Sequence, residues 1–162
     1  MPEKKLNVGI FSFTGDEGCV ITFLEILNYK LKAWQETVNF KYCRVMKAQN
    51  DLHDLDVAFV EGAISNFKEE EKLKEIRANC KRLVAIGTCA INGAPSNHRN
   101  FFDTKTLEEI KPILAKFGHR PKVSGLDEIV KVDAIVPGCP IVESAFVDLM
   151  DKYLKEFGVV QS

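Results

Sequence analysis

Short apolar runs alternate along the chain with segments of helical periodicity. The apolar runs predict strands, at residues 6–13, 40–46, 56–61, 83–86 and 129–136. Apolar side chains spaced three and four residues apart predict amphipathic helices, at residues 20–34, 67–80, 107–117 and 142–157. Strands that alternate with helices are typical of an α/β fold, and strands with little internal alternation are buried on both faces. The pattern therefore predicts a doubly wound parallel sheet with helices on both faces.

Local signals refine these boundaries. Asn66 can cap the second helix, whose first turns carry acidic residues that suit the helix dipole. Pro112 should kink or restart the third helix, because proline removes a backbone donor. Residues 89–102, rich in Gly, Asn and Pro, predict a loop, and residues 122–126 a further connection. A chain of 162 residues suits one compact domain, so we expect a single domain over residues 1–162.

The charge balance narrows the possible partners. The chain has 22 Lys and Arg residues against 23 Asp and Glu residues, and its formal net charge is −1. This balance, without a polybasic run, predicts no nucleic-acid partner. The apolar runs are strand-sized, so we expect no membrane span. Residues 1–5 lead straight into the first predicted strand without an export signal, so the expected compartment is the cytoplasm.

The cysteines fall into two groups. Their odd number argues against a disulfide framework in a chain without a leader, and favours metal ligation or plain burial. Cys43 lies within a predicted strand and Cys80 on the apolar stripe of a predicted helix, so both are expected to be small buried hydrophobes. Cys19, Cys89 and Cys139 each follow the end of a predicted strand. Because parallel strands end at one edge of a sheet, we expect these three thiols to converge.

Three thiolates at one edge would make a soft, anionic metal site. Such ligands select iron–sulfur clusters, zinc or copper(I). A structural zinc site more often uses close C-x-x-C pairs, and the sequence has none. Gly18, Gly87 and Gly138 lie beside the cysteines and would let the backbone approach a bulky cluster. Their amides could donate hydrogen bonds to cluster sulfides, so we predict that these glycines contribute to cofactor binding.

A four-iron cluster takes four ligands, and Asp16 is the candidate for the fourth. It lies three positions before Cys19, so the two residues could face one cluster. Oxygen is a harder ligand than thiolate and should bind iron less firmly and change the reduction potential. Asp16 could instead be a solvated loop acid or the start of the next helix, and Glu17 could take its place as ligand. Glu61, which ends a predicted strand, is either a turn residue or a polar group near the cluster.

Four segments together resemble the small subunit of nickel–iron hydrogenases. They lie at residues 14–19, 60–63, 87–90 and 132–140, in the order and at spacing similar to those of that family. The Pro-Gly-Cys-Pro ending of the last segment is the most distinctive piece. The 20 kDa cluster-bearing subunit of respiratory complex I is a relative with the same fold. That subunit typically carries adjacent cysteines at the first site, whereas Cys19 stands alone here.

The resemblance implies a flavodoxin-like domain that holds the proximal [4Fe–4S] cluster. By motif position, Cys19, Cys89 and Cys139 are ligands, and Asp16 falls where most members have the first cysteine. In the family this cluster faces the large subunit, whose nickel–iron centre splits or forms dihydrogen. The implied function is electron transfer between that centre and further flavin or iron–sulfur subunits of a cytosolic hydrogenase. Larger members carry a further cysteine-rich region, so the resemblance implies one cluster here.

Three alternatives remain open. Residues 12–15 faintly resemble the phosphate loop of a flavodoxin that carries FMN, although Asp16 and Glu17 would repel a phosphate. A cluster subunit of the complex I type is a second alternative. The third is a non-redox interaction protein that has lost its cluster, with Asp16 as the first lost ligand. An absorbance spectrum would separate flavin bands from the broad shoulder of an iron–sulfur cluster.

Overall fold

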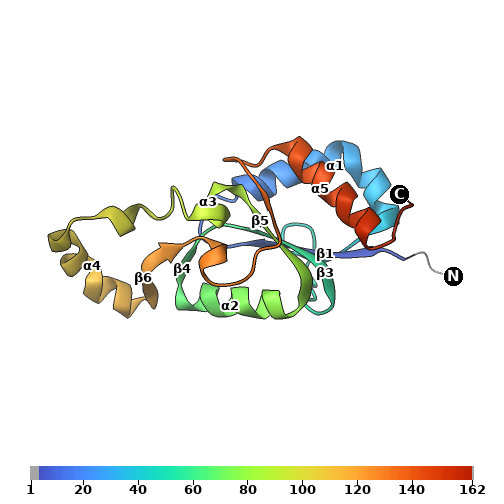
Figure 1. Ribbon diagram of the computed structural model, residues 1–162. Helices are drawn as coiled ribbons and strands as arrows, with labels where there is room; N and C mark the ends of the chain where they lie inside the picture. The colour runs from blue at the N-terminus through green and yellow to red at the C-terminus, as the bar shows by residue number, and fades with distance from the viewer. Residues whose placement is uncertain (1–3, 162) are drawn as a thin grey trace.

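The computed structural model describes residues 4–161 and contains one five-stranded parallel sheet. Its strand order is β2-β1-β3-β5-β7, and every neighbouring pair is parallel. The strands are β1 (Leu6–Ser12), β2 (Val38–Cys43), β3 (Leu55–Glu61), β5 (Cys80–Ile86) and β7 (Ala134–Val136). The predicted doubly wound, flavodoxin-like α/β fold is confirmed, because helices cover both faces of this sheet (Figure 1).

The helices divide between the two faces and one end of the sheet. They are α1 (Gly18–Thr37), α2 (Phe67–Ala78), α3 (Gly87–Asn92), α4 (Thr104–Lys116) and α5 (Glu143–Glu156), with short 3-10 helices η1 (His98–Phe101) and η2 (Leu126–Glu128). Helices α1 and α5 pack on one face, and α2 and α3 on the other. Helix α4 lies beyond the sheet, at the end where the strands finish (Figure 1).

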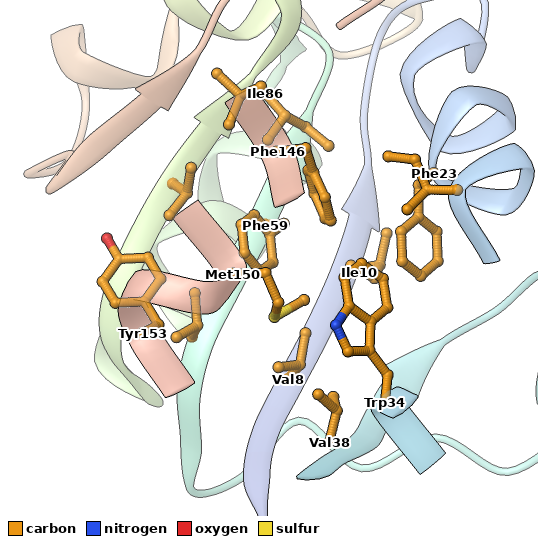
Figure 2. Packing of buried hydrophobic residues seen from close by; sticks show 14 of the residues in the cluster. Val8, Ile10, Phe23, Trp34, Val38, Phe59, Ile86, Phe146, Met150 and Tyr153 are labelled. Carbon is orange, nitrogen blue, oxygen red and sulfur yellow. The ribbon is translucent and has the colours of Figure 1, made fainter. Parts of the chain in front are cut away.

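The larger core lies under α1 and α5. Phe146 of α5 stacks against Phe59 of β3 with ring centroids 4.6 Å apart, and Phe23 and Trp34 of α1 lie beside it (Figure 2). Strand β3 is buried along its whole length, which explains its nearly continuous apolar sequence. Its buried Asp56 accepts hydrogen bonds from the Asn7 N–H and the Lys81 ammonium, so this charge is compensated.

A second, smaller sheet was not predicted. Strands β4 (Ile64–Asn66) and β6 (His119–Ser124) pair antiparallel beside the end of the main sheet. Each strand is short, and β6 contains a proline, so neither shows a clear alternating pattern. The residues that were predicted as a connection at 122–126 therefore belong partly to a strand and partly to η2.

Several other boundaries differ from the prediction. The last strand is confined to Ala134–Val136, because the preceding apolar residues pack against the smaller core without a strand partner. Cys80 begins β5 instead of ending the second helix, since α2 stops at Ala78. Cys89 lies within α3 instead of a loop. Helix α4 continues through Pro112, which removes one backbone donor from an exposed helix without ending it.

The predicted cap of the second helix is confirmed. The Asn66 side chain accepts a hydrogen bond from the Glu69 N–H at 2.9 Å, at the start of α2. None of the helices within residues 4–161 has the length and apolar character that crossing a lipid bilayer requires.

Candidate metal centre

Cys19, Cys89 and Cys139 line one pocket at the carboxyl edge of the main sheet. They lie in the first turn of α1, in α3 and in the loop between β7 and α5, so each follows the end of a parallel strand. Cys43 and Cys80 are buried at 0% and 9% exposure and do not line this pocket. The structure thus brings together the three cysteines that were predicted to converge and leaves the other two in the core.

Two of the neighbouring glycines are required by the close approach of these loops. Gly87 has a φ of +82°, and a Cβ atom at this position would overlap the Cys19 sulfur. Gly138 has a φ of +120°, and a Cβ atom there would overlap the Pro140 carbonyl oxygen. The Gly18 N–H, by contrast, donates a hydrogen bond to the Asp16 carboxylate at 3.0 Å. The role of the three glycines in cofactor binding stays a prediction.

Hydrogen bonds tie the three cysteine loops together. The Thr88 N–H and hydroxyl both donate to the Gly138 carbonyl, at 2.9 and 3.1 Å. The Ser96 hydroxyl lies 3.6 Å from the Cys89 sulfur and 3.4 Å from the Thr14 carbonyl oxygen, within reach of both as a donor. Ser96 carried no signal in the sequence, because only the folded chain places it beside a cysteine.

Glu61 is a buried polar group at this site. It is 3% exposed, and its carboxylate accepts hydrogen bonds from the Ser12 hydroxyl at 2.7 Å and the Val20 N–H at 3.0 Å. Burial raises the pKa of Glu61, while hydrogen bonds from Ser12, Val20 and Cys19 act in the opposite direction. Of the two roles considered for Glu61, the structure favours the polar group near the cysteines.

Burial disfavours the charged, thiolate form of Cys19. Burial raises the pKa of Cys19 to about 12; a hydrogen bond from the Ile141 backbone opposes the shift, and the nearby Glu61 carboxylate adds to it. A metal binds the thiolate, so metal binding at Cys19 would release a proton. The Cys139 side chain, by contrast, is exposed to solvent.

Asp16 and Glu17 both line the cysteine pocket. The Asp16 carboxylate accepts the Gly18 N–H, an arrangement that holds the loop in a turn before α1. Glu17 is the N-cap residue of α1 and has a left-handed φ of 59°. The N-cap position of α1 is therefore occupied by Glu17. The Asp16 carboxylate lies at the pocket, where it could contribute an oxygen ligand.

The donor set fits an iron–sulfur cluster in its chemistry. Three thiols line one pocket together with a carboxylate. Thiolates are the soft ligands that iron–sulfur clusters use, and the carboxylate would be a harder fourth ligand. The cavity between them is about 20 Å³, and no three His, Cys, Asp or Glu side chains within residues 4–161 are arranged to hold a metal ion as they stand. Cys139 and Asp16 are exposed, so the pocket faces solvent on that side.

A family model, described as NADH ubiquinone oxidoreductase, 20 Kd subunit, matches residues 17–153. The chain belongs to this family. The match spans all three cysteines of the pocket and most of the main sheet. Membership in the 20 Kd subunit family agrees with the resemblance that the cysteine motifs indicated.

Several curated relatives of the chain are hydrogenase subunits. The chain is 27% identical to the NAD-reducing hydrogenase HoxS subunit delta of Cupriavidus necator, over 92% of this chain and 78% of that protein. It is 28% identical to one subunit of the F420-non-reducing hydrogenase of Methanothermobacter marburgensis, over 85% of this chain and 49% of that protein. The chain thus spans about half the length of the second relative. These similarities confirm the resemblance to hydrogenase small subunits.

Solved structures support the fold. A chain in a crystal structure of an NAD+-reducing NiFe-hydrogenase in the H2-reduced state superposes with a TM-score of 0.80 at 24% identity. The superposition covers 98% of this chain and 99% of that chain. At this identity the similarity shows the fold alone.

Proposed function

We propose that this chain is the electron-transfer small subunit of a nickel–iron hydrogenase and holds one [4Fe–4S] cluster. The observation that carries the proposal is the convergence of Cys19, Cys89 and Cys139 on one pocket. Family membership and the hydrogenase relatives support it. A single flavodoxin-like domain, residues 1–162, would then supply the whole cluster site.

The pocket residues would have distinct tasks. Cys19, Cys89 and Cys139 would ligate iron, and Asp16 would supply the fourth ligand through its carboxylate. When bound, the cluster accepts and donates one electron at a time. The Ser96 hydroxyl, 3.6 Å from the Cys89 sulfur, would stabilise the charge on that thiolate. Glu61 would hold the start of α1 through the Val20 N–H.

The proposed partners follow from the relatives. The nickel–iron centre would lie on a hydrogenase large subunit, and electrons would pass onward to further flavin or iron–sulfur subunits. A location in the cytoplasm is part of the same proposal. A cluster subunit of the complex I type would use the same pocket, and the subunits that co-purify with the chain distinguish the two assemblies.

The FMN alternative is disfavoured by the contacts of residues 12–15. The Ser12 hydroxyl donates to the Glu61 carboxylate at 2.7 Å. The Thr14 hydroxyl lies 2.8 Å from the Glu69 carboxylate. The two hydroxyls that would bind a phosphate therefore face carboxylates, and a phosphate placed there would meet like charge.

Cluster binding is tested by substituting one pocket cysteine. The chain, purified anaerobically and separated from its partner subunits, should contain about four irons and four sulfides. Cys89→Ala should lose most of this iron, because it removes a ligand. Cys80→Ala is the matched control. Cys80 lies at the end of β5 that is far from the pocket, so this variant should keep its iron. Equal iron content in both variants, or a stable metal-free wild-type chain, would contradict the proposal.

The fourth ligand is tested separately. Asp16→Ala should lower the iron content, since it removes the carboxylate. Asp16→Cys should keep the cluster and shift its reduction potential, because thiolate is the softer ligand. Iron analysis and a redox titration followed by electron paramagnetic resonance measure both effects. Equal iron content and potential in the wild type and both variants would remove Asp16 from the ligand set.

A further inference from the structure

Helix α4 carries an apolar face that the rest of residues 4–161 covers only in part. None of its 13 residues is buried, and neither hydrophobic core within residues 4–161 includes an α4 residue. Ile113 is 55% exposed, although Leu107, Ile110 and Leu114 are partly covered. Figure 1 shows α4 projecting beyond the edge of the sheet where the strands end.

Four exposed apolar side chains belong to η1, α4 and the residues that directly follow them, and together we call them the arm surface: Phe101, Phe102, Ile113 and Phe117. Their exposures are 77%, 40%, 55% and 65% respectively. An isolated helix of about this length is only marginally stable in water, and most helices in proteins depend on packing of their apolar face. A concentration of exposed aromatic residues also marks interaction sites. We therefore expect the arm surface to be covered in the working protein.

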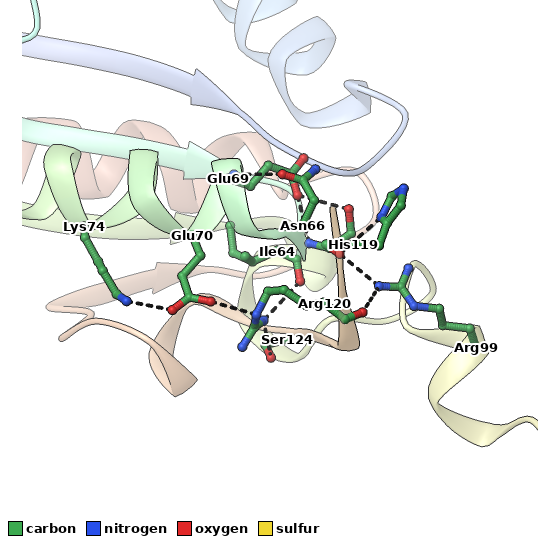
Figure 3. Close-up of polar contacts among 10 residues, drawn as sticks. Ile64, Asn66, Glu69, Glu70, Lys74, Arg99, His119, Arg120 and Ser124 are labelled. Carbon is green, nitrogen blue, oxygen red and sulfur yellow. Dashed lines mark hydrogen bonds and ion pairs between the residues drawn. The ribbon is translucent and has the colours of Figure 1, made fainter. Parts of the chain in front are cut away.

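The base of the arm is firmly anchored. The Asn100 side chain donates to the Val123 carbonyl at 2.7 Å and accepts the Val123 N–H at 2.9 Å. The Arg99 guanidinium donates to the carbonyls of Ser65 and Arg120 at 2.9 and 2.8 Å (Figure 3). These bonds tie η1 to both strands of the small sheet. The arm surface is therefore presented on a fixed support, as a preformed docking site requires.

Ion pairs fix the next part of the support. Arg120 of β6 pairs with Glu70 of α2 at 2.8 Å, and Glu70 also pairs with Lys74 at 2.6 Å (Figure 3). Strand β6 runs directly from α4, so these pairs hold the carboxyl end of the helix against the body of the protein.

The arm is continuous with the cysteine pocket. Ser96, which lies beside the Cys89 sulfur, stands five residues before Phe101. Both the pocket and α4 lie at the carboxyl edge of the sheet. A protein that covers the cysteine pocket and extends along this edge would therefore meet the arm surface as well.

The charge of the arm indicates the chemistry of its partner. Residues 98–122 have a formal charge of +3, in a chain whose net charge is −1. This charge comes from six cations, Arg99, Lys105, Lys111, Lys116, Arg120 and Lys122, and three acids, Asp103, Glu108 and Glu109. Lys111, Lys116 and Lys122 make no ion pair within residues 4–161. A complementary partner would present an apolar groove bordered by carboxylates.

We propose that the arm surface docks the large subunit that covers the cysteine pocket, in an apolar groove bordered by carboxylates. The inference rests on the proposed function for the identity of this partner. The cluster would lie at the centre of the interface, and the arm surface would lie at one side of it. Ile113 and Phe117 would be anchors, and the three unpaired lysines would steer the approach.

The test replaces the anchors in the full chain and measures binding to the co-expressed hydrogenase large subunit. The double variant Ile113→Glu, Phe117→Glu should bind this subunit at least about tenfold more weakly, because two carboxylates would enter an apolar, acidic groove. The matched control is Leu31→Glu, Ala33→Glu on α1, which changes two exposed apolar residues on another face. The control should bind like the wild type.

The iron content of each preparation separates the two proposals. Wild type, double variant and control should contain equal iron and unfold at equal temperatures, since the arm surface touches neither the pocket nor the core. A wild-type chain without iron would contradict the proposed function. A wild-type chain with iron whose affinity for the large subunit survives the double substitution would overturn the docking proposal alone. A wild-type dimer that the double variant abolishes would assign the surface to a second copy and also overturn it.

Discussion

Helices α4 and α5 have similar lengths and similar amphipathic sequences, but they differ in how many side chains they bury. Helix α5 has 14 residues and buries Phe146, Met150, Tyr153 and Leu154. Helix α4 has 13 residues and buries none. Both segments were predicted as helices from the same spacing of apolar residues, so the pattern identifies a helix without identifying what covers it.

The difference lies in the surface that each helix meets. Helix α5 faces the five-stranded sheet, where Phe146 packs on Phe59 and beside Phe23. Helix α4 makes its main contacts with β6 of the two-stranded sheet, which is too narrow to cover an apolar helix face. An amphipathic helix without a covering surface in its own chain thus indicates an interface, whereas the same pattern over a broad sheet indicates a core.

The largest expected effect comes from truncating Phe146 of α5, compared with Phe117, which directly follows α4. Phe146→Ala should lower the free energy of unfolding by about 3–5 kcal/mol, because it opens a cavity in a closely packed core. Phe117→Ala should change it by no more than about 0.5 kcal/mol, because that side chain is 65% exposed. Urea unfolding of the purified chain measures both. A large loss for Phe117→Ala would show that α4 packs within the chain and would remove the contrast between the two helices.

The main sheet could be predicted from the sequence, whereas the small sheet could not. The strands of the main sheet are buried apolar runs, and their carboxyl ends share an edge by the rules of parallel sheets. The convergence of Cys19, Cys89 and Cys139 therefore followed from the sequence. Strands β4 and β6 were missed because both are short, β6 contains a proline, and neither shows a clear alternating pattern.

The polar details of the site depended on tertiary contacts. Glu61 was visible as an acid at a strand end, but its burial follows from the packing of β1 and α1 around it. Ser96 reaches Cys89 only because the chain turns back after α3. Cys80 was placed on a helix because its spacing fits the apolar stripe of α2, whereas the helix ends at Ala78 and the residue enters the next strand.

A smaller effect on the free energy of unfolding is expected from removing ion pairs. It should be larger for a pair in the main sheet than for a pair at the base of the arm. In the body, the Asp133 carboxylate accepts the Leu83 N–H at 2.8 Å and pairs with Arg77 at 2.7 Å, which fixes β7 beside β5. Burial alone would raise the pKa of Asp133, but these hydrogen bonds and the charge of Arg77 outweigh it and hold the pKa below its usual value. At the base of the arm, hydrogen bonds from Lys74 and the charge of Arg120 lower the pKa of Glu70.

Because the pKa of Asp133 is lower in the folded chain than in the unfolded chain, its contribution to stability is present above the unfolded pKa of about 3.9 and is lost as the pH falls through the folded pKa. Asp133→Asn should therefore lower the free energy of unfolding by about 1–3 kcal/mol at pH 7, since the Leu83 N–H and Arg77 lose a charged acceptor. The difference from the wild type should shrink as the pH falls below about 4. Urea unfolding across this pH range measures it, with Glu70→Gln as the matched control, whose effect should be smaller because solvent screens that pair. A difference for Asp133→Asn that stays constant with pH would mean that the carboxylate charge does not hold β7 in the sheet.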